Sequence, residues 1–245
     1  MQYLLWQLVD SAFPAGGFAH SSGLEATVQH GAVTDSGSLG AFVRQSVAQA
    51  GSGALPLVNG AHANPADLGE LDALCDAFLT NPVANRASRA QGQAFLSTCQ
   101  RSFLIRGPLP PGLLAPLAGP HRPAPFRSFP ESAIEPVARI VRTEKLLCHH
   151  APLFGAILNV LGVDRLHTQR LFLYLGSRSV ISAAVRLGVV GAYDAQQIQG
   201  TIGEEIDRTI ERCGHLTPLE ITQTAPLIDL RQATHDRLYS RLFQS

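Results

Sequence analysis

The chain has almost no lysine and no excess of charge of either sign. Lys145 is its one lysine against eighteen arginines, and the formal net charge at pH 7 is zero. A nucleic-acid-binding domain normally carries a basic excess or a basic stripe, so a nucleic-acid partner is not expected. A net charge near zero gives little electrostatic protection against association. The composition therefore favours a protein that works in a complex.

Paired cysteines and an export signal are also lacking. Cys75, Cys99, Cys148 and Cys213 are far apart and form no CxxC pair. The first residues, "MQYLLWQLVDSAF", are apolar but have no basic region before them, which is unlike a secretory signal. We expect four reduced thiols in a cytoplasmic protein.

The longest apolar segment, residues 171–193, contains two charges. Arg178 and Arg186 lie inside it, and each would cost roughly 2.5–3.5 kcal/mol at the centre of a bilayer. We therefore expect a buried helix pair and no membrane partner. Arg186, in "SAAVRLG", needs acceptors if it is buried, which predicts a structural ion pair or bonds to backbone carbonyls.

Strand signals are scarce, whereas helix signals recur. The chain has no Asn-Gly hairpin turn and no sustained alternation of apolar and polar residues. Apolar residues instead recur at helical spacing, as in the set Leu39, Phe42, Val43 and Val47 and the set Ile198, Ile202, Ile206 and Ile210. The pattern predicts an all-α fold, a single-domain helical bundle of roughly ten helices over residues 1–245. The end of the chain, "DLRQATHDRLYSRLFQS", is expected to be a last helix that frays.

One segment departs from the helical pattern. Residues 105–136 hold nine of the sixteen prolines, and proline removes a backbone donor and breaks helices. We predict a proline-rich loop inserted in the domain. Helix starts are predicted elsewhere at Asn64-Pro65 and Asn81-Pro82, where a capping side chain precedes a proline. Ser22 and Glu25 form a capping-box pattern.

Catalytic and nucleotide-binding motifs are missing. The sequence has no GxxxxGK[ST], GxGxxG, HExxH or GxSxG, which disfavours the corresponding sites. A hydrolase would have to use Ser11, Ser21 or Ser22 with His20, and no third partner is indicated. We expect no enzymatic activity and keep hydrolysis as an alternative.

A metal site is weakly indicated. Cys148, His149 and His150 are consecutive, and His20 and His30 flank the capping-box pattern. Adjacent histidines on a helix point about 100° apart, so they do not easily chelate one ion together. We assign no metal and no cofactor to the chain itself, although His149 or His150 could be one ligand of a shared site.

The last residues are unusually rich in aromatic and arginine side chains. Tyr239, Leu242 and Phe243 stand beside Arg241, whereas chain ends are commonly polar and frayed. Such residues are favoured anchors of protein interfaces. Two interpretations remain open: this tail folds back on its own core, or a partner orders it.

Four segments carry a resemblance to a known family. "LVDSAFPAGGFAHSSGLE", "NRASRAQGQAFL", "RSVISAAVRLGVVGAYDAQ" and "THDRLYSRLFQS" resemble, in order, segments of the urease accessory protein UreF family. The resemblance covers the chain except residues 105–136. It implies an all-α homodimer that binds UreD (also called UreH) and recruits the GTPase UreG, in a complex that delivers nickel to apo-urease. The resemblance implies that the chain acts as a non-enzymatic scaffold in this complex. The alternative is a metallochaperone that binds nickel directly.

The resemblance also implies roles for individual residues. It makes the "GGFAH" segment an elbow whose Phe18 and His20 face a partner, with Gly16 and Gly17 providing backbone freedom and Ser22 and Glu25 starting the next helix. Arg241 matches a tail residue ordered on UreD binding, and Tyr239, Leu242 and Phe243 are expected beside it. Arg170 and Tyr174 resemble the family's dimer contact, and Arg186 resembles a structural residue at the dimer or in a tunnel wall.

Overall fold

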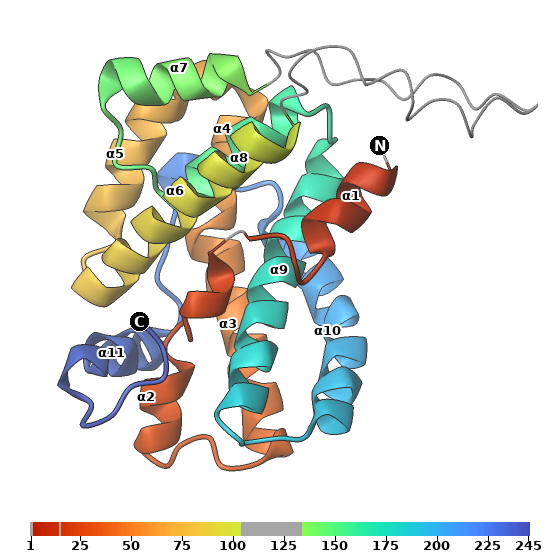
Figure 1. The fold of residues 1–245 in the computed structure, drawn as a ribbon, viewed down its shortest axis with the longest axis vertical. Coiled ribbons are helices and arrows are strands. Elements are labelled where there is room, and N and C mark those ends of the chain that lie inside the picture. Colours follow the sequence, from red (N-terminus) through yellow and green to blue (C-terminus); the bar gives the residue numbers. More distant parts are fainter. Residues whose placement is uncertain (1, 15, 104–133) are drawn as a thin grey trace, which may run out of the picture.

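A computed structural model describes residues 2–14, 16–103 and 134–245. These ranges form eleven α-helices and no strand, which confirms the all-α prediction (Figure 1). The helices are α1 (Gln2–Val9), α2 (Leu24–Gln29), α3 (Ser36–Gly53), α4 (Leu55–Ala63), α5 (Leu68–Phe78), α6 (Pro82–Phe103), α7 (Glu135–Glu144), α8 (His150–Val160), α9 (Arg165–Arg186), α10 (Ala192–Cys213) and α11 (Pro226–Ala233).

The centre of the molecule is the packing of α4 against α8, the most extensive helix contact in the described ranges. All residues from Ala151 to Leu158 are buried, as expected for a helix that is apolar on every side. Gly155 permits the close approach, because a Cβ there would overlap the carbonyl group of Val58 in α4. A side chain at this position would force the two helices apart.

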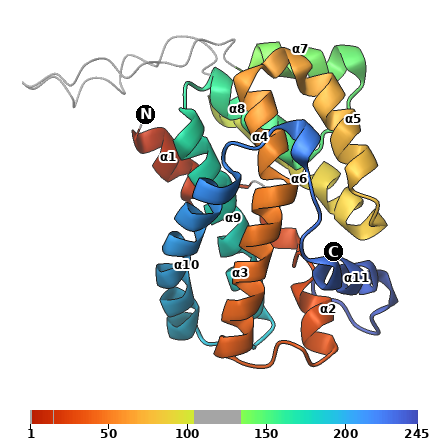
Figure 2. The same cartoon turned by 180° about the vertical axis from the view of Figure 1, so that it is seen from behind.

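One end of the molecule consists of α3, α9 and α10. The two views show α9 and α10 side by side with α3 beside them (Figures 1 and 2). Ile202 and Ile206 of α10 are buried, as their four-residue spacing predicted. Arg178 of α9 donates to the carbonyl oxygen of Val9. None of the helices in the described ranges is both long and apolar enough to span a bilayer.

The opposite end contains α5, α6 and α7. Asn81 caps α6, since its Oδ1 accepts from the backbone N–H of Val83 at 3.0 Å. Asn64 caps a short 3₁₀ turn, Pro65–Asp67, in the same way. Most of the predicted proline-rich loop lies outside the described residues, but its end was placed wrongly: Ile134 is buried, and α7 begins at Glu135 with Pro136 in its first turn. Proline is tolerated there because the first helical N–H groups have no partner within the helix.

The predicted last helix, residues 229–245, is correct only at its beginning, because residues 229–233 belong to α11. Helix α11 ends at Ala233, and the remaining residues make a 3₁₀ turn (His235–Arg237) followed by irregular backbone. Figure 1 shows α11 beside α2, with the C-terminal end of the chain close to both. The last residues fold back on the first quarter of the chain, which brings the elbow and the tail together. We define the elbow as residues 16–25 and the tail as residues 234–245.

Candidate functional site

Left-handed backbone conformations shape the elbow. Gly16 has φ +79°, and a Cβ there would lie 2.9 Å from the Cβ of Ala94 in α6; both facts favour glycine, as predicted. Gly17 does not need the same freedom, because its φ is not positive and an added Cβ would make only a contact of 3.4 Å with Ser179. Its carbonyl oxygen instead accepts from the Ser179 hydroxyl at 2.9 Å, which fixes the elbow to α9.

The predicted capping box at Ser22 and Glu25 is wrong. The residue that precedes α2 is Gly23, in the left-handed region, and no side chain caps the helix. Ser22 has φ +52°, whereas a capping residue normally has extended backbone. The carboxylate of Glu25 turns to the tail and accepts from Leu242 N at 2.5 Å, Phe243 N at 3.2 Å and His235 Nε2 at 2.9 Å.

His20 is buried under the tail, with 5% of its surface exposed. Its Nδ1 lies 2.5 Å from the hydroxyl of Ser245, and the neighbouring Ser21 donates its backbone N–H to the Ser245 carbonyl oxygen at 2.6 Å. Burial lowers the pKa of His20, and electrostatic interaction with His235 and Arg86 lowers it further. The expectation that His20 faces a partner is therefore not met in this conformation.

The tail residues that were predicted as partner contacts divide into two groups. Phe243 is buried against the elbow, whereas Tyr239 is fully exposed and Leu242 is about half exposed. Arg241 is exposed and donates to Asp236 at 3.3 Å. Of the two open interpretations, the tail in the described structure folds on its own chain, yet it still presents an aromatic and an aliphatic side chain to the surroundings.

Arg186 joins the elbow to the tail. Its guanidinium carbon lies 4.0 Å from the ring centre of Phe18 and 4.3 Å from that of Phe243. Its Nη1 also donates to the carbonyl oxygen of Phe18 at 2.6 Å. The backbone acceptor and the two rings agree with the structural role predicted for Arg186. A place in a dimer or a tunnel wall stays a prediction.

Arg170 and Tyr174 lie on α9 at the edge of a shallow hollow of about 310 Å³ between α1, α9 and α10. Arg170 donates its Nε–H to Asp207 of α10 at 2.9 Å. The rest of the lining is mainly apolar and includes Leu5, Val9, Leu171 and Ile206. The predicted dimer contact thus lies on an apolar hollow with an ion pair at its edge.

Cys148, His149 and His150 do not converge. The ring of His149 lies 3.1 Å from both Ser88 Oγ and Asp76 Oδ1, while that of His150 packs among the rings of Phe95, Phe154 and Phe172. Burial lowers the pKa of His150 to about 4 and raises that of the Cys148 thiol. Within the described ranges no three His, Cys, Asp or Glu side chains are placed to hold a metal ion.

Two arrangements bear on the hydrolase alternative. At the elbow, Ser21 Oγ donates to the Ser245 carbonyl oxygen at 3.2 Å instead of to His20. Asp76 of α5, His149 just before α8 and Ser88 of α6 follow the hydrogen-bond order of a catalytic triad. His149 is completely buried, however, and Ser88 Oγ also accepts from the backbone N–H of His150 at 3.2 Å. This chain of bonds holds the start of α8 against α6.

Two polar contacts of the tail could not be predicted from local patterns. His235 is buried and pairs with Glu25 across 210 positions of sequence, and Arg86 of α6 donates its Nη2 to both carboxylate oxygens of Asp236 at 2.8 and 2.9 Å. No spacing within one segment signals either pair. The only available signal was the unusual composition of the tail.

Five of the eleven large apolar side chains exposed in the described ranges belong to the elbow, α11 and the tail. They are Phe18, Leu227, Leu230, Tyr239 and Leu242. Scattered exposed apolar side chains are normal, but several on elements that meet at one place are typical of an interaction site. We call these five residues the elbow–tail surface. Glu25 accepts from the backbone of Leu242, Arg186 lies against the ring of Phe18, and Leu227 and Leu230 belong to helix α11, so four of the five side chains are carried by ordered backbone.

Known proteins resemble the chain over nearly its whole length. A family model described as UreF matches residues 33–202. Urease accessory protein F of Oryza sativa subsp. japonica is 35% identical over 241 residues, covering 97% of this chain and 83% of the relative. Urease accessory protein F of Arabidopsis thaliana is 34% identical over 249 residues, covering 100% and 93%. Urease accessory protein UreF of Arthrobacter sp. (strain FB24) is 25% identical over 248 residues, covering 100% and 97%.

Proposed function

The chain belongs to the UreF family of urease accessory proteins, and from this membership we propose that it is a non-enzymatic scaffold of urease maturation. In this proposal it binds UreD (UreH) and, with it, recruits the GTPase UreG so that nickel reaches apo-urease in the cytoplasm. The observation that carries the proposal is the elbow–tail surface. Exposed aromatic and aliphatic side chains on an ordered backbone bind a partner without a large cost of ordering the loop.

Nickel is cargo of the complex in this proposal. The soft and imidazole side chains that a metallochaperone would use are separated: His149 bonds to Ser88 and Asp76, and His150 packs among phenylalanine rings. A thiol with a raised pKa, such as that of Cys148, is less available as the thiolate that binds metal. These surroundings favour the scaffold over the metallochaperone.

We further propose that the protein forms a homodimer through the hollow between α1, α9 and α10. The hollow is lined by apolar side chains with Arg170 and Asp207 at its edge, and α1 beside it exposes Tyr3 and Trp6. An apolar centre with a polar rim is the usual composition of a dimer interface. Sedimentation of Tyr174→Glu, which should dissociate to monomers, tests this assembly.

The scaffold is tested by pull-down with UreD and UreG. Changing both Tyr239 and Leu242 to Ser leaves the buried Phe243 and its bonds to Glu25 intact, so the tail should keep its fold. We expect this double variant to lose UreD and, with it, UreG. Interface anchors of this kind commonly cost 2 kcal/mol or more, roughly a 30-fold loss of affinity each.

Two other exposed apolar residues provide a matched control. Tyr193 and Leu219 are 89% and 92% exposed and lie outside the elbow–tail surface. Changing both to Ser removes the same kinds of side chain and should leave the binding of UreD unchanged. Equal binding by the two double variants would contradict the proposed interface.

A further inference from the structure

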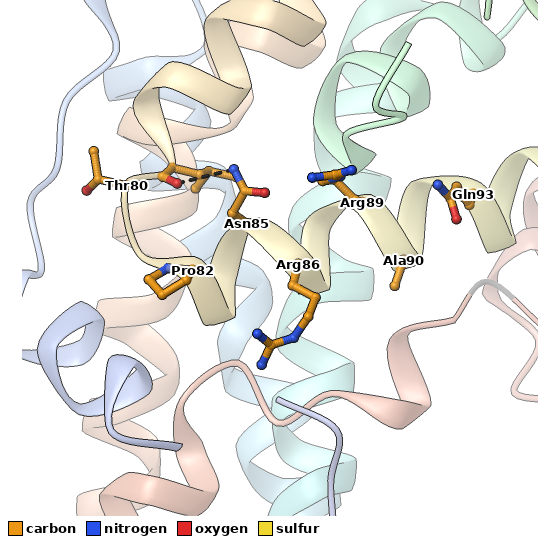
Figure 3. Close-up of a pocket in the computed structure, with 8 residues that line it drawn as sticks. Thr80, Pro82, Asn85, Arg86, Arg89, Ala90 and Gln93 are labelled. Carbon is orange, nitrogen blue, oxygen red and sulfur yellow. Dashed lines mark hydrogen bonds between the residues drawn. The ribbon is translucent and has the colours of Figure 1, made fainter. Parts of the chain in front are cut away.

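An open groove of about 620 Å³ runs along the exposed side of α6 and the turn before it (Figure 3). Its polar lining consists of Arg86, Arg89, Asn85, Gln93 and Thr80. The three residues Leu79, Pro82 and Ala90 supply the apolar part. The groove is distinct from the elbow–tail surface, although Arg86 contacts the tail.

Arg89 has no hydrogen bond and no ion pair to any residue in the described part of the chain, although its side chain is half-buried. The nearby Asp76 interacts with Arg89 through its charge, but its Oδ1 accepts from Asn85 Nδ2 at 2.8 Å and faces His149 Nε2 at 3.1 Å, and no hydrogen bond or ion pair joins it to Arg89 in the described residues. Removing a guanidinium group from water without giving it acceptors is unfavourable. Arg89 is therefore a cation available to a ligand.

Arg86 shows which chemistry this side of the helix accepts. Its Nη2 lies 2.8 and 2.9 Å from the two carboxylate oxygens of Asp236 in the tail. The pair is partly exposed, with 54% and 43% of the two side chains accessible. Asp236 thus occupies one arginine of the groove from within the same chain, and an incoming carboxylate would compete with it.

We propose that the α6 groove binds an acidic segment of a protein partner, with one carboxylate on Arg89 and another exchanging with Asp236 on Arg86. Figure 3 shows the two guanidinium groups extending to opposite sides of α6. Successive side chains of an extended peptide also point to opposite sides, so neighbouring acidic residues can reach one arginine each. Guanidinium and carboxylate groups match as bidentate pairs.

The lining favours a peptide over a small anion. Leu79, Pro82 and Ala90 offer apolar contacts that a phosphate ion cannot use, and Gln93 and Asn85 can bond to a peptide backbone. Arginine beside apolar side chains is a frequent composition of protein interfaces. The inference rests on α6 and Asp236 and holds independently of the scaffold proposed above.

The test measures the fluorescence anisotropy of a short labelled peptide of alternating Glu and Ala, titrated with the full chain. We expect saturable, salt-sensitive binding. Arg89→Gln should weaken it about tenfold, the loss expected for a charge-assisted bond at a half-buried site. Arg212→Gln, which makes the same change on the exposed side of α10, should leave it unchanged. Equal weakening by both variants would overturn the proposal.

The variant Asp236→Asn should act in the opposite direction. It releases Arg86 from its internal carboxylate, so the peptide should bind about threefold more tightly, a gain that misfolding cannot produce. Glu211→Gln makes the same charge change on α10 and should give no gain. A similar gain in both variants, or displacement of the peptide by inorganic phosphate at equal charge concentration, would overturn the assignment to an acidic peptide.

Discussion

The α8 core and the elbow–tail junction are both well buried, but different forces hold them together. Helix α8 is surrounded by apolar side chains, with Phe154 stacked on Phe95 at a ring distance of 5.2 Å. The junction is held by directional bonds: three donors reach the carboxylate of Glu25, and one guanidinium lies between two rings. The α8 core is held by the exclusion of water from apolar side chains. The junction is held by hydrogen bonds to the buried carboxylate of Glu25.

This difference predicts different responses to mutation. Apolar packing spreads its stabilisation over many weak contacts, so damage to the core lowers the stability of the whole domain. The junction depends on a few strong bonds, and their loss can release the tail while the core stays folded, because proteins open locally at low cost where few apolar contacts hold them. A segment that binds a partner is therefore expected at the elbow–tail junction, which opens more easily than the core.

The largest effect should follow from Phe154→Ala. Phe154 is completely buried and touches the rings of Phe95, His150 and Phe172. Removing such a ring leaves a cavity that the helices cannot fill and costs about 3–5 kcal/mol. Urea denaturation measures the loss in the free energy of unfolding. Tyr193→Ala, at an 89% exposed position, should stay within about 0.5 kcal/mol.

An intermediate effect is expected from pH, through His150. Burial lowers the pKa of His150 from 6.5 to about 4, so below pH 6.5 the unfolded chain binds a proton more readily than the folded one. The free energy of unfolding should therefore fall as the pH drops from about 6.5 to about 4, by roughly 3 kcal/mol in total. His20, whose pKa is also lowered, adds a loss of the same sign.

Replacing His150 isolates its share of the pH dependence. His150→Leu keeps an apolar side chain of similar volume among the phenylalanine rings, and its unfolding free energy should change much less between pH 6.5 and 4. The exposed His215 provides the control: His215→Asn should keep the full pH dependence of the parent chain. An unchanged slope in His150→Leu would place the titrating group elsewhere, with His20 as the next candidate.

The same difference explains what could be predicted from the sequence. The helices of the core follow a periodic signal: the spacing of Leu39, Phe42 and Val43 marks one face of α3, and all three are buried. Helix starts were also readable where the cap and its targets are neighbours, as at Asn81. Such signals are contained within a few turns of one helix, and they need no knowledge of the rest of the fold.

The junction could not be read in this way. Ser22 and Glu25 match a capping box, yet the partners of Glu25 lie more than 200 positions later in the chain. The carboxylate of Glu25 turns to the tail because buried N–H donors there need an acceptor. The backbone N–H groups at the start of α2 do not depend on a side-chain cap. Asp35 and Ser38 make a real capping box, which shows that the pattern is sound and that tertiary contacts overrode it at Glu25.

The smallest effect on global stability, and the most informative for the comparison, is expected from Glu25→Gln. The amide retains one acceptor oxygen, so at least one of Leu242 N, Phe243 N and His235 Nε2 would face a donor; an unsatisfied buried group of this kind costs about 1–3 kcal/mol. Hydrogen exchange should accelerate at the amides of Leu242 and Phe243 and stay slow along α8. Asp35→Asn makes the same change at an exposed cap that Asn also serves well, and should alter neither set of amides. Equal acceleration in the tail and in α8 would mean that the junction and the core open as one unit, and the proposed separation between them would be lost.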